Sequence, residues 1–219
     1  MRKGKKLLLG ALLFAALFVG ILLVYNLTKQ AETPVPAPED YAVLVRTESL
    51  SGQGVIYAAE GKSCFVVTAG HVLAGLSAGD FCTVLFSDGS KVQACIRYLS
   101  DIADVAFLEM ETDGPVPGAP IWNRERFDAA KYGDSCFALD LDGEETRRIQ
   151  GTLLEPWVYL EDFSLNMMLV KLPAKYGMSG CGIYSADGSF LGILCGINDD
   201  GEAAVLPLSV IISEWEAGI

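Results

Sequence analysis

The sequence predicts an all-β fold of two six-stranded antiparallel β-barrels with a short C-terminal helix, preceded by an N-terminal transmembrane helix. Three observations lead there. Twelve short β-type runs follow residue 40, Asp-Gly or Gly pairs separate many of them, and no long amphipathic helix lies between them. A Pro/Gly-rich break at 113–120 divides the runs six and six. A parallel sheet would instead need helical crossovers.

The first 40 residues are expected to form a membrane anchor and a spacer. Residues 7–25 carry no charge, and about 20 such residues span a bilayer as a helix. Four of the 16 basic residues precede this stretch, whereas all 28 acidic residues follow it. We therefore expect a cytoplasmic stub at 1–6, a single-pass signal anchor at 7–28, a Pro-rich linker at 29–40 and an extracytoplasmic domain. A cleaved signal peptide, which would leave the domain secreted, is the alternative.

The strands are expected in order along residues 41–219. Barrel 1, at about 41–112, would take the runs at 41–47, 54–59, 64–69, 81–86, 91–99 and 104–110. Barrel 2, at about 120–208, would take those at 135–141, 148–154, 165–172, 182–186, 190–197 and 202–208. The last segment predicts a helix with Ser209 as its N-cap.

Composition narrows the classes of partner. The formal net charge is −12, which disfavours nucleic acid and anionic membrane surfaces because both need clustered cations. The chain has one histidine and no C-x-x-C pair among its six cysteines, so we expect no metal and no cofactor. Disulfides are permitted outside the cytoplasm. A two-residue turn at Asp88-Gly89 would place Cys82 opposite Cys95, which predicts either a disulfide or two buried free thiols.

Three local signatures together supply the groups needed for acyl transfer. VVTAGH places His71 at the end of a strand, SDIADVAFLEM opens a strand with Asp104, and YGMSGCGIY holds Ser179 in a glycine-rich turn. Alone, each has an ordinary structural explanation. A serine hydroxyl becomes nucleophilic when an imidazole takes its proton, and a carboxylate fixes the tautomer of that imidazole.

The order of these residues along the chain selects among hydrolase folds. An α/β-hydrolase needs the serine first and G-x-S-x-G, but here His71 precedes Ser179 and Cys181 replaces the last glycine. A subtilisin order needs an aspartate upstream of the histidine, and Asp40 lies in the linker. The order His, Asp, Ser on an all-β chain is that of chymotrypsin.

The region from about residue 41 to 214 resembles the protease domain of the HtrA/Deg family of trypsin-like serine peptidases. The similar segments are SGQGVIY, FVVTAGHVL, FSDGSKVQACIRYLSDIADVAFLEM, YGDSCFAL, LVKLPAKYGMSGCGIYSADGSFLGILCGI and AAVLPLSVI. The resemblance implies His71 as general base, Asp104 as orienting acid and Ser179 as nucleophile. It also implies an oxyanion hole formed by the N–H groups of Gly177 and Ser179. Asp101 is the alternative acid.

The sequence departs from the family pattern beside the nucleophile. Met178 replaces Asn or Asp, and Cys181 replaces glycine, either of which could misalign the oxyanion loop. Cys181 as the nucleophile is a weaker alternative. The resemblance covers no PDZ domain, so we expect none.

The resemblance also predicts a substrate site. Pro173 stands where trypsins carry an aspartate, which favours a small or medium apolar residue at the cleavage position. Cys195 and Gly196 would pair with the substrate as an added strand.

The predicted function is that of a membrane-anchored serine endopeptidase acting on protein or peptide substrates. The alternative is a pseudo-protease that retains the barrels as a protein-binding module. A third hypothesis treats Cys181 and Cys195 as a redox pair beside the active site.

Overall fold

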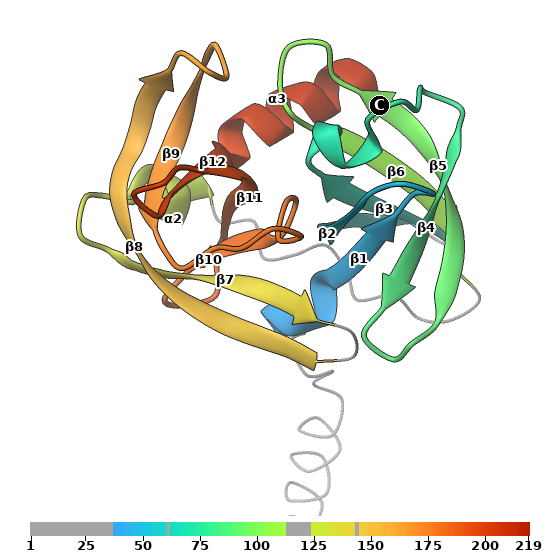
Figure 1. Cartoon of the computed structure of the whole chain (residues 1–219), viewed down its shortest axis with the longest axis horizontal. Helices are drawn as coiled ribbons and strands as arrows, with labels where there is room; N and C mark the ends of the chain where they lie inside the picture. Colours follow the sequence, from blue (N-terminus) through green and yellow to red (C-terminus); the bar gives the residue numbers. More distant parts are fainter. Residues whose placement is uncertain (1–36, 61, 113–123, 143–144) are drawn as a thin grey trace, which may run out of the picture. The chain divides into compact units, whose positions relative to one another are not determined.

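The computed structural model describes residues 37–60, 62–112, 124–142 and 145–219 of the chain. Within these residues twelve strands form two closed antiparallel barrels (Figure 1), which confirms the predicted pair of six-stranded barrels. Barrel 1 has the strand order β1-β2-β3-β6-β5-β4, and barrel 2 has the order β10-β11-β12-β9-β8-β7.

Each predicted run forms one strand, with ends that differ mostly by one to three residues. Barrel 1 consists of β1 (Ala42–Arg46), β2 (Ser51–Glu60), β3 (Ser63–Thr68), β4 (Phe81–Phe86), β5 (Lys91–Leu99) and β6 (Ala106–Glu111). Barrel 2 consists of β7 (Ser135–Asp142), β8 (Glu145–Leu160), β9 (Leu165–Lys171), β10 (Gly182–Ser185), β11 (Phe190–Ile197) and β12 (Glu202–Pro207). Strand β8 is much longer than predicted.

Within the described residues the helical segments are short. They are the 3₁₀ turns η1 (Pro38–Tyr41) and η2 (Gly70–Leu73), and the α-helices α2 (Arg124–Asp128) and α3 (Leu208–Gly218). Among the residues that the structure describes, no helix is both long enough and apolar enough to cross a membrane. The predicted stub at 1–6 and anchor at 7–28 lie outside the described residues, as do most of the linker and the break at 113–120.

The β4–β5 hairpin corrects the predicted cysteine pairing. Cys82 lies opposite Ala94, and Cys95 lies opposite Phe81. The turn contains three residues rather than two, because Gly89 adopts a φ of 82° and its N–H donates to Phe86 O at 3.0 Å. A shift of one residue turns side chains to opposite faces of a sheet, so the two thiols point apart and both are free.

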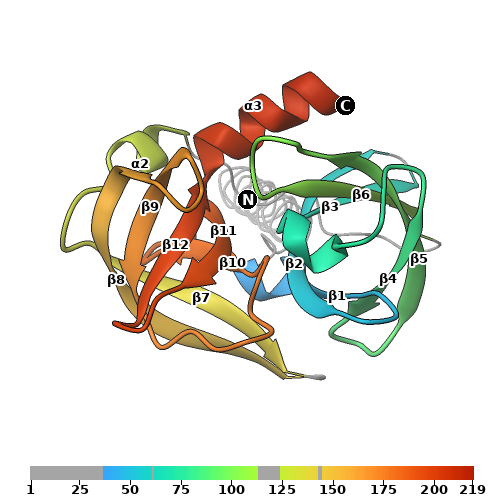
Figure 2. The same ribbon diagram turned by 45° about the horizontal axis from the view of Figure 1, so that its top comes forward.

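Helix α3 joins the two barrels (Figure 2). It follows the last strand of barrel 2, and its Trp215 packs edge-on against Phe107 of barrel 1 with ring centroids 5.0 Å apart. The Tyr98 hydroxyl donates to Glu214 Oε2 at 2.8 Å. The predicted cap at Ser209 is wrong: Pro207 occupies the N-cap position and the helix begins at Leu208. Proline suits the end of β12 because its fixed φ starts the turn without needing an N–H donor.

The hydrophobic core is continuous between the barrels. One buried cluster contains Phe107 and Val67 of barrel 1 together with Tyr184 and Ile193 of barrel 2. A second cluster fills the interior of barrel 2. The barrels are therefore packed against each other through apolar side chains, which holds the loops along their junction in a fixed relation.

Candidate active site

His71 and Asp104 lie in contact at the ends of two paired strands. His71 lies in η2, directly after β3, and Asp104 lies two residues before β6. Both carboxylate oxygens of Asp104 contact His71. Its Oδ1 accepts the backbone N–H of His71 at 2.8 Å, and its Oδ2 lies 2.7 Å from His71 Nδ1. Two contacts fix the orientation of the imidazole ring, and they leave Nε2 as the outward-facing nitrogen.

The turn before β6 sets the position of Asp104. Ser100 Oγ accepts the N–H groups of Ile102 at 3.1 Å and Ala103 at 2.9 Å, so the chain turns before the aspartate. Asp101, the alternative acid, is exposed in this turn. Gly70 lies under the carboxylate, where an added Cβ would meet Asp104 Oδ1 at 3.3 Å. The structure therefore pairs His71 with Asp104.

The electrostatics of the pair favour a charged imidazole. The hydrogen bond from Asp104 raises the pKa of His71 above its ordinary value, although burial of the ring acts in the opposite direction. Burial alone would raise the pKa of Asp104, but the hydrogen bonds from the side chain and backbone of His71 outweigh it and lower that pKa. Asp104 therefore stays ionised, and His71 can accept a proton more readily than a free imidazole.

Ser179 lies in the loop between β9 and β10, and from Gly177 to Cys181 two N–H groups have no acceptor among the described residues. Between Gly177 and Cys181, the N–H of Met178 donates to Lys175 O and that of Cys181 to Met178 O, at 3.2 and 2.9 Å. The N–H of Gly180 donates to Leu194 O at 2.7 Å. Within the described residues the N–H groups of Gly177 and Ser179 donate to no protein atom. These are the two groups that the resemblance assigns to an oxyanion hole.

Gly52 of β2 brings the serine loop to the histidine segment. A Cβ at Gly52 would meet Val72 Cγ2 at 2.5 Å on one side and the Ser179 carbonyl oxygen at 2.8 Å on the other. The next residue, Gln53, donates its N–H to that same carbonyl at 2.7 Å. Ser179 is thus tied to barrel 1 beside the residue that follows His71. Within the described residues, however, its hydroxyl makes no hydrogen bond to His71.

Both unusual neighbours of Ser179 are buried. Met178 is 1% exposed, and its sulfur accepts the N–H of Lys175 at 3.4 Å, so a thioether closes the turn in place of a polar side chain. Cys181 is also 1% exposed, and burial raises the pKa of its thiol far above the ordinary range. A buried, protonated thiol is a poor nucleophile.

The predicted substrate residues are divided between two places. Pro173 lines a surface hollow of about 520 Å³ together with Leu172, Gly151 and Gly201. Cys195 is 5% exposed and its thiol points to Asp104 O at 3.6 Å, on the inner side of β11. Gly196 faces Phe163, the ring of which lies 3.3 Å from the position of an added Cβ.

Sequence reasoning missed three polar residues behind the serine loop. Asp140 is 3% exposed and accepts Gln53 Nε2 at 2.9 Å and Lys175 Nζ at 2.9 Å. The available signals were an acidic residue inside an apolar strand run and a glutamine between two glycines. Neither signal shows which residue Asp140 or Gln53 contacts, because these contacts join residues 35 or more positions apart.

Comparisons with known proteins agree with this fold. A sequence profile described as "Trypsin-like peptidase domain" matches residues 52–193, so the chain belongs to the trypsin-like peptidase family. Two curated relatives, each named "Serine protease Do-like HtrA", are similar over a shorter stretch. The protein from Lactococcus lactis subsp. cremoris (strain MG1363) is 42% identical over 65 residues, and that from subsp. lactis (strain IL1403) is 40% identical over 65 residues. The match covers 30% of this chain and 15% of each relative.

Solved structures of the same fold include two forms of the M. tuberculosis protease Rv3671c. An inactive form superposes with a TM-score of 0.68 at 20% identity, covering 86% of this chain and 92% of that chain. An active form superposes with a TM-score of 0.69 at 19% identity, covering 83% of this chain and 82% of that chain. At these identities the likeness shows the fold alone.

Proposed function

We propose that the chain is a serine endopeptidase that hydrolyses peptide bonds through an acyl-enzyme on Ser179. The observation that carries the proposal is the two-point contact of Asp104 with His71, next to Val72, which packs on Gly52 together with the Ser179 carbonyl. Membership of the trypsin-like peptidase family supports the same assignment.

The proposed reaction has two halves, formation of the acyl-enzyme and its hydrolysis, and the same groups act in both. With its Nδ1–H donated to Asp104, His71 accepts the Ser179 proton at Nε2 as Oγ attacks the carbonyl carbon. The N–H groups of Gly177 and Ser179 stabilise the oxyanion. His71 then gives the proton to the leaving amine, the C–N bond breaks, and an acyl-enzyme remains. Water, deprotonated by His71, releases the acid and restores Ser179.

A fluorophosphonate probe tests this proposal without knowledge of the substrate. We expect the purified full-length chain to be labelled, and Ser179→Ala and His71→Ala to remain unlabelled although folded. Ser49→Ala, which removes the hydroxyl of an exposed serine, serves as the matched control and should be labelled like the wild type. Labelling of the Ser179→Ala variant would overturn the assignment of the nucleophile.

A second candidate function is a protein-binding module that does not catalyse. One observation favours it: within the described residues, Ser179 Oγ and His71 are not hydrogen-bonded. Catalytic hydrogen bonds are often long in unliganded enzymes and tighten when substrate binds. Binding of an unfolded protein with equal affinity by wild type and Ser179→Ala, without labelling of either, would favour the binding module.

We also propose an extracytoplasmic, membrane-anchored location. Its support is the uncharged stretch at 7–25 and the four basic residues before it. In intact cells, an externally added protease should digest the domain while a cytoplasmic marker survives. If 7–25 is an anchor, the wild type should stay with the membrane and a deletion of 7–25 should not. If it is a cleaved signal peptide, the wild-type domain should be released as well.

A further inference from the structure

One peptide group in the serine loop has no hydrogen bond of its own. It joins Tyr176 to Gly177 and carries the Gly177 N–H. Within the described part of the loop from Lys175 to Cys181, every other peptide group has at least one end bonded to the protein. Gly177 has a φ of 91°, and Tyr176 is 98% exposed. Nothing in the peptide itself therefore fixes the direction of its N–H.

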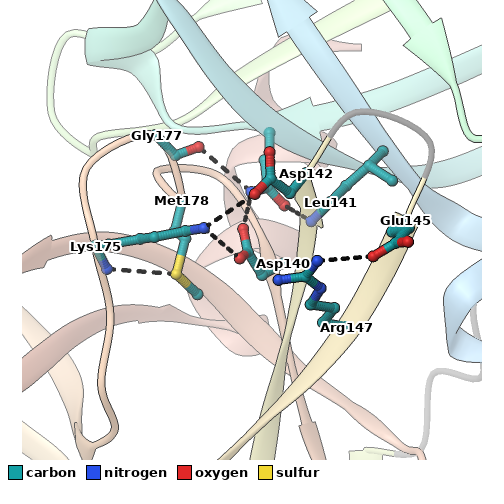
Figure 3. A network of polar contacts seen from close by, with 9 residues as sticks. Asp140, Leu141, Asp142, Glu145, Arg147, Lys175, Gly177 and Met178 are labelled. Atoms are coloured by element: carbon teal, nitrogen blue, oxygen red, sulfur yellow. Dashed lines mark hydrogen bonds and ion pairs between the residues drawn. The ribbon is translucent and has the colours of Figure 1, made fainter.

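Lys175, the residue before Tyr176, is held by its side chain. Lys175 Nζ lies 2.9 Å from Asp140 Oδ2 and 3.5 Å from Asp142 Oδ2, as Figure 3 shows. The hydrogen bond to Asp140 raises the pKa of Lys175 above its ordinary value, so the ammonium is charged at neutral pH. Asp140 is 3% exposed, and a buried carboxylate needs such a partner.

The residue after this peptide is held by a glutamine from the other barrel. Gln53 Nε2 donates to Gly177 O at 3.4 Å and to Asp140 Oδ1 at 2.9 Å. Its Oε1 accepts the Leu141 N–H at 3.0 Å, which fixes the orientation of the amide. Gln53 is 2% exposed. The same carboxylate thus anchors both sides of this peptide, directly through Lys175 and through Gln53, which holds the Gly177 carbonyl.

We propose that Lys175, Asp140 and Gln53 form a clamp that holds the Tyr176–Gly177 peptide with its N–H directed at the oxyanion. The proposal rests on the proposed function. Rotation of this peptide changes ψ of Tyr176 and φ of Gly177. The clamp restrains the chain on both sides of these bonds, because Lys175 is bonded to the buried Asp140 carboxylate and the Gly177 carbonyl accepts from Gln53. The three residues touch no reacting atom; they are positioning residues. Their effect should fall on the transition state, because the oxyanion exists only after the serine has attacked.

The kinetic test replaces the ammonium and then restores the charge. Lys175→Met keeps most of the side chain but removes the ion pair, so kcat should fall about 10-fold to 100-fold while KM changes less than about 3-fold. Lys175→Arg should recover most of kcat. The matched control Lys131→Met removes another exposed lysine of barrel 2 and should leave kcat unchanged. Equal kcat in wild type and Lys175→Met, or no recovery with arginine, overturns the proposal.

Hydrogen–deuterium exchange tests the clamp independently of activity. Asp140→Asn should speed exchange in the segment 174–180, whereas Asp142→Asn, on the exposed partner, should change it little. Lys175→Met should speed exchange in the same segment. Unchanged exchange in both Asp140→Asn and Lys175→Met overturns the clamp even if the wild type proves inactive. Failure of the wild type to react with the fluorophosphonate, with faster exchange in these variants, would overturn the proposed function alone.

Discussion

At the scale of single residues, the two oxygens of the Asp104 carboxylate make different contacts with His71. Asp104 places one oxygen on the backbone N–H of His71 and the other on the ring. The aspartate thus fixes both the position and the orientation of the base. An amide at this position would keep the shape but lose the hydrogen bond to a charged carboxylate that raises the pKa of His71.

Replacing Asp104 by Asn should change both the rate and its pH dependence. His71 acts as a base only when neutral, so kcat/KM should rise with pH through its pKa, with a midpoint above the ordinary value of about 6.5. In Asp104→Asn that midpoint should move to lower pH, and kcat should fall about 1,000-fold to 10,000-fold. Asp101→Asn is the control. A pH–rate series checks this, and an unshifted midpoint in Asp104→Asn would contradict it.

Met178 gives a second prediction at this scale. Asparagine there would match the family pattern but would bury an amide among Leu172, Leu191 and Cys181. We expect Met178→Asn to lower the free energy of unfolding by about 2 kcal/mol. Met178→Leu, which conserves volume, should cost less than about 1.5 kcal/mol. Urea unfolding measures both, and a more stable asparagine variant would show that the thioether does not suit this turn.

At the scale of elements, local sequence patterns predicted the strands but not the register of the β4–β5 hairpin. Each run is rich in apolar and β-branched residues and many end near a turn residue, so its position depends on neighbours in sequence. The β4–β5 register depends on whether the turn takes two residues or three, and both choices use Asp88-Gly89. That one-residue difference moved Cys95 to the other face.

Helix α3 stabilises barrel 1 through Trp215. Trp215 contacts the rings of Tyr57, Phe65 and Phe107 at centroid distances of 5.0 to 5.2 Å. Trp215→Ala should lower the free energy of unfolding by about 3 kcal/mol because it opens a cavity over barrel 1. Glu216→Ala, on the exposed face, should change it by less than about 0.5 kcal/mol. Thermal unfolding compares the two; equal effects would mean that the helix does not cover the barrel.

At the scale of the whole molecule, the sequence predicted the architecture and the three candidate catalytic residues but not the contacts between barrels. His71, Asp104 and Ser179 each lie in a recognisable local motif. Asp140 and Lys175 come from separate parts of barrel 2, and Gln53 meets them only because the two barrels pack together. No local pattern encodes these contacts. The hydrophobic core that joins the barrels likewise draws on strands far apart in the chain.

The thiols give a prediction for the folded molecule as a whole. All six cysteines are free, and five of them are buried. Ellman's reagent should therefore titrate six thiols per chain in denaturant and at most one, Cys95, rapidly in the native protein. The unfolding temperature and any peptidase activity should be the same with and without reductant. A reductant-dependent activity would instead favour the redox pair of Cys181 and Cys195.

The position of α3 has a consequence for the timing of folding during synthesis. Barrel 1 comes from the first half of the domain, yet Trp215, which packs against its aromatic rings, comes from residues 208–218. A growing chain therefore leaves that apolar surface uncovered until the ribosome has nearly finished the domain. Barrel 1 therefore gains the full cover of its aromatic rings only after the strands of barrel 2 have been synthesised.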